Sequence, residues 1–163
     1  MADALPEKLA DLLATLDLVP DRADRIQLLI DVADRFEGVP ESLAARPYPE
    51  PHRVPGCESE AFVWAEPRPD GTFRYRFAVE NPQGISAKAL AVILDETLSG
   101  ARPEEVARVP PDLIYRIFGP ELSMGKSMGL MGMIQKVQSE TRVLSAQASA
   151  TSRRGRGGRS RPR

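Results

Sequence analysis

Residues 61–80 read AFVWAEPRPDGTFRYRFAVE, and this stretch decides the fold. An apolar run over 61–66 is followed by a turn that ends in Asp70-Gly71, and then by an alternating run over 72–80. An Asp-Gly pair before an alternating run is typical of a β-hairpin. In the second run the apolar side chains point one way and the arginines the other, namely Phe73, Tyr75, Phe77 and Val79 against Arg74 and Arg76. We therefore expect a hairpin with one buried face and one face that is wet or covered by polar groups.

The segments on both sides of the hairpin carry apolar residues at helical spacing. Before it, the pattern predicts a helix over 5–16 and a second helix that begins after Asp21, an N-cap residue, and closes at Gly38 and Pro40. The buried face predicted for the second helix consists of Ala23, Ile26, Leu29, Ile30, Ala33 and Phe36. After the hairpin, helices are predicted over 85–99, from Pro103, over 110–118 and from about 122 to Leu144. Because the helices are grouped around the strands, the predicted fold class is α+β, with a small antiparallel sheet.

The composition indicates one soluble globular domain followed by a basic tail. The chain has 163 residues, of which 42% are hydrophobic and 28% charged. We expect residues 1–145 to form the domain and residues 146–163 to be disordered, because the tail is first Ala/Ser-rich and then Arg/Gly-rich. The six arginines of residues 153–163 offset an acidic remainder, since without them the net charge of −1 becomes −7 for residues 1–152. Such a tail is either a solvated terminus or a weak, nonspecific contact for nucleic acid.

The one cysteine of the chain lies in the stretch Val54-Pro55-Gly56-Cys57-Glu58-Ser59-Glu60, directly before the first strand. The Pro-Gly pair favours a turn, so Cys57 is expected on a loop that leads into the sheet. A lone cysteine is either a small buried hydrophobe or a displayed reactive group, and its position alone leaves both interpretations open. One cysteine excludes an internal disulfide and a multi-cysteine metal site, and no metal or cofactor is expected on this chain. With no apolar run long enough for a membrane, we expect a cytoplasmic protein.

Two other patterns carry less weight. Gly119 followed by Gly125-Lys126-Ser127 fails the spacing of a phosphate-binding loop by one residue, and no parallel strand precedes it. His52, the only histidine, is separated from Cys57 by a proline-rich connection, so a fixed cysteine–histidine pair is not expected.

Two segments together resemble the SufE family of sulfur-acceptor proteins. The first is Val54-Pro55-Gly56-Cys57-Glu58-Ser59, which is similar to the family's Gly-Cys-x-Ser motif before an apolar strand. The second is Leu122-Ser123-Met124-Gly125-Lys126-Ser127-Met128-Gly129-Leu130 with Met133-Ile134 beyond it, which is similar to the family's Leu-x-Pro-Ser-Arg-Ser-x-Gly-Leu and its following helix. Lys126 stands where the family usually has arginine; it keeps the charge and loses the planar fork.

The resemblance implies a sulfur carrier that acts with a SufS-like cysteine desulfurase in iron–sulfur cluster assembly. Cys57 would accept persulfide sulfur, stimulate the desulfurase and pass the sulfur on to a cluster scaffold. Gly56, Glu58, Ser59, Lys126 and Gly129 would support the loop or bind the partner. Pyridoxal phosphate is expected on the desulfurase and not on this chain, which is an accessory protein and not a stand-alone enzyme.

The residues themselves add one expectation and one alternative. Glu58 and Glu60 flank Cys57, and their negative charge should disfavour the thiolate until a partner docks. The alternative function is a non-catalytic interaction module with a structural cysteine and a nucleic-acid-binding tail.

Overall fold

The predicted hairpin forms the sheet of the protein. The computed structural model describes residues 4–156, in which β1 (Ala61–Pro67) and β2 (Phe73–Val79) pair as an antiparallel two-stranded sheet. Asp70 shapes the turn, because its carboxylate accepts hydrogen bonds from the backbone N–H and the hydroxyl of Thr72, at 2.9 and 2.6 Å. The hydrogen bond from the Thr72 hydroxyl lowers the pKa of Asp70 below its ordinary value, since it favours the ionised form. Gly71 adopts φ = 85°, a left-handed conformation that glycine takes without strain.

Helices flank the hairpin in the predicted order, and the α+β fold class is confirmed. Asp21 caps the second helix as predicted, with its carboxylate accepting a hydrogen bond from the N–H of Asp24 at 3.0 Å. The helical elements are α1 (Glu7–Asp17), α2 (Arg22–Asp34), the 3-10 helix η1 (Glu50–His52), α3 (Ile85–Leu98), α4 (Pro103–Ala107), α5 (Leu113–Phe118) and α6 (Met124–Arg156).

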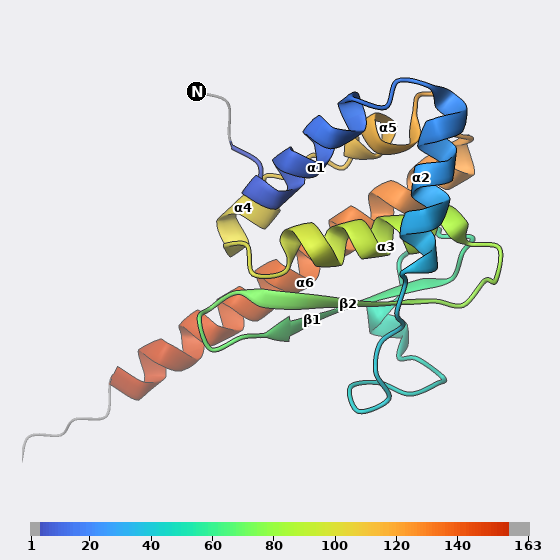
Figure 1. Cartoon of the computed structure of the whole chain (residues 1–163). Helices are drawn as coiled ribbons and strands as arrows, with labels where there is room; N and C mark the ends of the chain where they lie inside the picture. The colour runs from blue at the N-terminus through green and yellow to red at the C-terminus, as the bar shows by residue number, and fades with distance from the viewer. Residues whose placement is uncertain (1–3, 157–163) are drawn as a thin grey trace, which may run out of the picture.

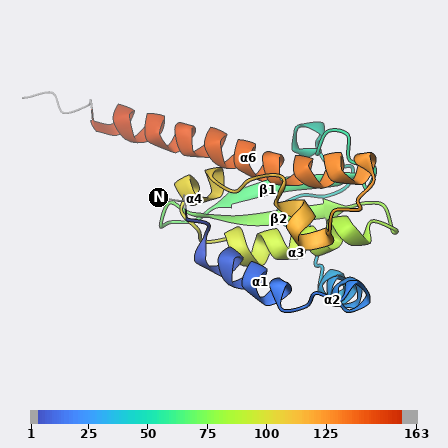
Figure 2. The same ribbon diagram turned by 90° about the horizontal axis from the view of Figure 1, so that it is seen from above.

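The main core lies between one face of the hairpin and two helices. Helix α6 packs along β1 and α3 packs along β2, while α1 and α2 cover the outer side of α3 (Figures 1 and 2). The apolar face of β2 enters this core, where Tyr75 is fully buried. The hydroxyl of Tyr75 and that of Thr141 on α6 form a buried hydrogen bond of 2.6 Å, which satisfies the polar end of the ring.

The second face of the hairpin corrects one expectation. Near its open end this face is apolar and buried, with Phe62, Trp64 and Ala78 packed in a separate cluster beside Val39 and Tyr48. The proline-rich connection folds back over the sheet here, and the ring of Tyr48 lies 5.3 Å from both Phe62 and Trp64. The polar face that the alternation predicts is therefore restricted to the turn end, where Arg76 pairs with Glu66 at 3.2 Å.

The buried face predicted for α2 is also only partly correct. Leu29 and Ala33 are buried, but Ala23 and Ile26 are exposed, and 47% of Ile26 is accessible. The helical pattern predicts which side of α2 is apolar, but it does not predict which segment packs against that side. In the described chain nothing covers the first turns of α2 there. The result is an open apolar surface between α2 and the start of α3.

Helix α6 is longer than predicted. It continues to Arg156, whereas the sequence pattern placed its end at about Leu144 and a disordered segment from 146 onward. Residues 146–155 are all exposed, so they bury no core. Alanine-rich residues nevertheless extend a helix that packing has already nucleated, because each further residue adds a hydrogen bond without a new nucleus. This end of α6 projects beyond the rest of the fold (Figure 1), and the prediction for 157–163 lies outside the described residues.

Candidate functional site

Cys57 lies on a tight loop that two left-handed residues shape. Gly56 has φ = 67° and Glu60 has φ = 51°, so the chain reverses on both sides of the cysteine. The backbone N–H of Val54 donates to the carbonyl oxygen of Ala61 at 2.8 Å and closes the loop. The N–H of Asn81 donates to the carbonyl oxygen of Ser59 at 3.1 Å, which ties the loop to the end of β2. The turn role expected for Gly56 therefore has a structural basis.

The loop rests on a glycine face of α6. Gly125, Gly129 and Gly132 follow one another at spacings of four and three, which places them on one side of the helix. A Cβ atom at Gly129 would lie 3.4 Å from both Cα and Sγ of Cys57. A Cβ at Gly132 would lie 3.0 Å from Cγ1 of Val54, and one at Gly125 would lie 3.0 Å from Oε1 of Glu58. Absent side chains thus let the loop approach the helix backbone closely.

Five of the six predicted site residues line one cavity. Its volume is about 340 Å³, and it lies between the loop, the start of α3 and the start of α6. The five are Cys57, Glu58, Ser59, Lys126 and Gly129. Gly56 does not line the cavity and acts on the shape of the loop. Cys57 is 8% exposed, so its thiol is largely covered by the loop and the helix, whereas Glu58 and Lys126 reach solvent.

Two residues of this site were missed by the sequence analysis. Gly125 and Gly132 received no role there, although they support the loop on either side of Gly129. Their common helical face was the available signal, because a row of glycines on one face of a helix leaves room for a close neighbour. Gly129 lies within α6 and serves packing, so only Gly56 of the two predicted glycines is a turn glycine.

His52 contacts the sheet and α6. Its Nδ1 donates to the carbonyl oxygen of Val63 at 2.9 Å and lies 3.4 Å from Oε1 of Glu140. Its ring stacks on Trp64 with the centroids 5.1 Å apart. These contacts give His52 a structural role between β1 and α6.

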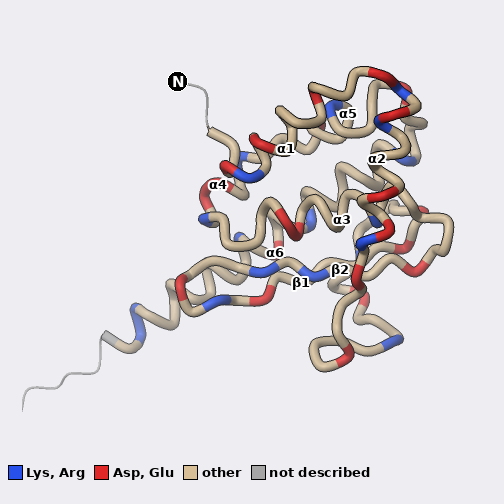
Figure 3. Tube along the Cα trace, in the orientation of Figure 1, with Lys and Arg blue, Asp and Glu red and all other residues tan. Residues whose placement is uncertain are grey.

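The basic end of α6 lies far from the loop. Arg153 and Arg154 are exposed on its last turns, and Figure 3 shows basic residues but no acidic ones along the projecting end. The remaining arginines of the predicted tail lie outside the described residues, and contact with nucleic acid stays a prediction. Within residues 4–156, no cluster of three or more His, Cys, Asp or Glu side chains is placed to hold a metal ion. In the same range, no helix is long and apolar enough to span a bilayer.

Fold and loop together define a class of protein: an α+β domain that presents a single cysteine over the glycine face of a helix. A family model described as SufE, Fe-S metabolism associated domain, matches residues 10–141. The chain therefore belongs to the SufE family, as its two motifs predicted, and this membership places it in iron–sulfur metabolism.

Two individual proteins are similar to this chain. The chain is 37% identical over 94 residues to the chloroplastic quinolinate synthase of Oryza sativa subsp. japonica, a match that covers 56% of this chain and 12% of that protein. It also resembles the solution structure of a hypothetical protein from Thermus thermophilus, with a TM-score of 0.66 and 30% identity. That likeness covers 85% of this chain and 96% of the other. Because the chain spans only a small part of the rice protein, the similarity carries no activity of that whole protein.

Proposed function

We propose that the protein is a sulfur carrier for iron–sulfur cluster assembly, which accepts persulfide sulfur from a cysteine desulfurase onto Cys57. The observation that carries the proposal is the placement of the only cysteine on a shaped loop, in a cavity, in a chain of the SufE family. The carrier stimulates the desulfurase by removing its product sulfur, and then delivers the sulfur to a cluster scaffold. Pyridoxal phosphate belongs to the desulfurase, and we expect both proteins in the cytoplasm.

The transfer is a displacement at sulfur. The Cys57 thiol loses its proton, and the thiolate attacks the terminal sulfur of the persulfide on the donor cysteine. A new S–S bond forms at Cys57 while the S–S bond of the donor breaks, and the electron pair leaves with the donor thiolate. That thiolate takes up a proton, so one thiol and one persulfide become one persulfide and one thiol without net oxidation. A chain with one cysteine cannot divert the sulfur by forming an internal disulfide, which suits a carrier.

Burial of Cys57 favours a carrier that acts only on a docked partner. At 8% exposure the thiol offers little surface to a soluble reagent, and Glu58 and Glu60 add negative charge beside it. The loop approaches α6 at Gly125, Gly129 and Gly132, where the helix presents no side chain to it. A partner that draws the loop out would expose Cys57 only where sulfur is delivered.

The deciding experiment is intact-protein mass spectrometry after incubation with a purified cysteine desulfurase and L-cysteine. We expect the protein to gain one sulfur atom, which a reductant removes, and the Cys57→Ser variant to gain none. A variant that lacks residues 153–163 should gain sulfur like the whole chain, because Arg153 and Arg154 lie at the opposite end of α6 from Gly129, which contacts the loop. No gain from several desulfurases that are themselves active would contradict the proposal and would favour the interaction module with a structural cysteine.

A further inference from the structure

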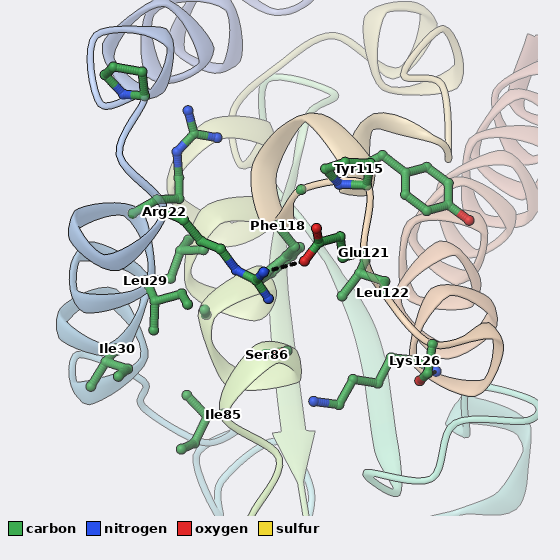
Figure 4. A pocket seen from close by; sticks show the side chains of 17 residues that line it. Arg22, Leu29, Ile30, Ile85, Ser86, Tyr115, Phe118, Glu121, Leu122 and Lys126 are labelled. Carbon is green, nitrogen blue, oxygen red and sulfur yellow. Dashed lines mark hydrogen bonds and ion pairs between the residues drawn. The ribbon is translucent and has the colours of Figure 1, made fainter.

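A groove larger than the cysteine cavity opens between α2, the start of α3, α5 and the connection into α6. Its volume is about 740 Å³, and Figure 4 shows the side chains that line it. The walls are largely apolar and include Ile26, Leu29, Ile30, Ile85, Phe118 and Leu122. The side chains on opposite walls of this groove are separated by open space, so packing in the main core does not account for its apolar lining.

Three large apolar side chains of this groove are unusually accessible. Ile26 is 47% exposed, Ile85 is 48% exposed and Tyr115 is 38% exposed, although they come from three different helices. Single exposed apolar residues are common on proteins, whereas several gathered in one concave surface mark a site of interaction.

The charges of the groove leave one cation available. Arg22 of α2 forms an ion pair with Glu121 on the opposite side, drawn dashed in Figure 4. Arg25 is engaged by the fold, because its guanidinium donates to the backbone carbonyl oxygens of Leu16, Val19 and Arg116. Lys126 forms no ion pair within residues 4–156, and its ammonium group points into the groove (Figure 4).

The groove adjoins the cysteine cavity. Ile85, Ser86 and Lys126 line both, so they form the boundary between the apolar surface and Cys57. A chain segment that occupies the groove would therefore end beside the thiol that accepts sulfur.

We propose that the groove anchors the sulfur donor, which is a protein that inserts a large apolar side chain between Ile26 and Ile85 and sets a carboxylate against Lys126. The proposal rests on the function proposed above and names the surface that the donor recognises. A protein donor has to orient its cysteine toward Cys57, and a second contact beside the cysteine cavity can fix that orientation. The domain is acidic, with a charge of −7 over residues 1–152, so an available lysine at the junction selects where an acidic group of the donor approaches.

The test compares two substitutions of the same kind. Ile26→Glu places a charge in the groove, and Leu18→Glu places one at an apolar residue that is 81% exposed and outside the groove. Each variant is titrated against the desulfurase that loads Cys57, and the concentration for half-maximal stimulation is measured. We expect Ile26→Glu to raise this concentration by roughly tenfold or more, as loss of a central apolar contact does, and Leu18→Glu to leave it unchanged. Tyr115→Ala, on the facing wall, provides a second groove variant should Ile26→Glu unfold.

A second readout separates this proposal from the function on which it depends. Sulfur uptake at a desulfurase concentration far above that for half-maximal stimulation needs Cys57 but not tight docking, so intact-protein mass should show that Ile26→Glu still gains one sulfur atom under these conditions. The proposed role of the groove is wrong if both groove variants need the same desulfurase concentration for half-maximal stimulation as the unchanged protein. It is also wrong if Leu18→Glu raises this concentration as much as Ile26→Glu does. Neither result would contradict sulfur transfer to Cys57. If the groove instead holds a second copy of this chain, light scattering will show a dimer that Ile26→Glu dissociates, and that result also overturns the proposal. Failure of the unchanged protein to gain sulfur at Cys57 from any active desulfurase would refute the carrier function itself.

Discussion

The two ends of α6 are stabilised in different ways. The first turns contain Gly125, Gly129 and Gly132, which are poor helix formers, yet here the helix is packed against the cysteine loop and the core. Residues 146–155 contain three alanines, the best helix former, and all ten residues are exposed. The packed end is stabilised by tertiary contacts and can therefore contain glycine for the sake of the loop. The projecting end depends on its own backbone hydrogen bonds.

Substituting glycine by valine at each end is expected to give the largest contrast. Gly129→Val adds methyl groups beyond a Cβ that already lies 3.4 Å from Cα and Sγ of Cys57, so the loop must shift. We expect the free energy of unfolding to fall by about 1–3 kcal/mol, as overpacking does, and sulfur loading of Cys57 to be lost. Denaturant unfolding and intact mass measure the two effects.

The matched control is Gly155→Val, at a glycine with no atom within 4 Å of an added Cβ. Its free energy of unfolding should stay within about 0.5 kcal/mol of the parent, with normal loading. Gly129→Ala adds only a Cβ, which makes ordinary contacts at 3.4 Å and raises the helix propensity. Its free energy of unfolding should therefore be closer to that of the parent than the free energy of Gly129→Val. Equal loss of loading in Gly129→Val and Gly155→Val would show that the loop does not depend on the glycine face.

A smaller difference in stability is expected between two substitutions of threonine by valine on α6, one in the packed part and one in the projecting end. Thr141 donates its hydroxyl to the carbonyl oxygen of Val137 at 2.7 Å and accepts from Tyr75, so Thr141→Val leaves the buried Tyr75 hydroxyl without this partner. We expect a loss of about 1–3 kcal/mol in the free energy of unfolding. Thr151→Val removes an exposed bond of 3.1 Å to the carbonyl oxygen of Gln147 and should change stability very little. Similar losses in both variants would mean that the projecting end contributes to the cooperative fold.

The smallest effect concerns alkaline pH. Burial raises the pKa of Tyr75 above the ordinary tyrosine value of 10.0, since the core disfavours a phenolate. Above pH 10.0 the unfolded chain releases this proton while the folded chain keeps it, so stability present below that pH is lost as pH rises toward the folded pKa. Unfolding by denaturant at increasing alkaline pH should show this decline, and Tyr75→Phe should reduce it. An unchanged decline in Tyr75→Phe would assign it to other groups.

Features set by neighbouring residues were predictable from the sequence. The turn at Asp70-Gly71 and the cap at Asp21 each depend on a side chain and a backbone group within three residues. The cysteine loop was recognised because its motif is short and Cys57 is unique. The family was likewise predictable from the two short motifs around Cys57 and Lys126.

Features that depend on distant segments were not predictable in this way. Ile26 belongs to an apolar helical face, but only the positions of α3 and α5 decide that it borders a groove. Burial of Phe62 and Trp64 depends on the path of the connection that carries Tyr48. The roles of Gly125 and Gly132 required knowing which face of α6 meets the loop.

The length of α6 places the arginines of its projecting end far from the thiol of Cys57. From Gly129 to Arg154 the helix rises by about 37 Å, at about 1.5 Å per residue. This is several times the distance of about 8 Å over which exposed charges act at physiological ionic strength. Arg153 and Arg154 are therefore screened from the thiol of Cys57, and an acidic molecule bound to them would leave the electrostatic surroundings of Cys57 unchanged. Helix α6 is long enough for a molecule to be bound at its projecting end while the loop of Cys57 stays accessible to another partner.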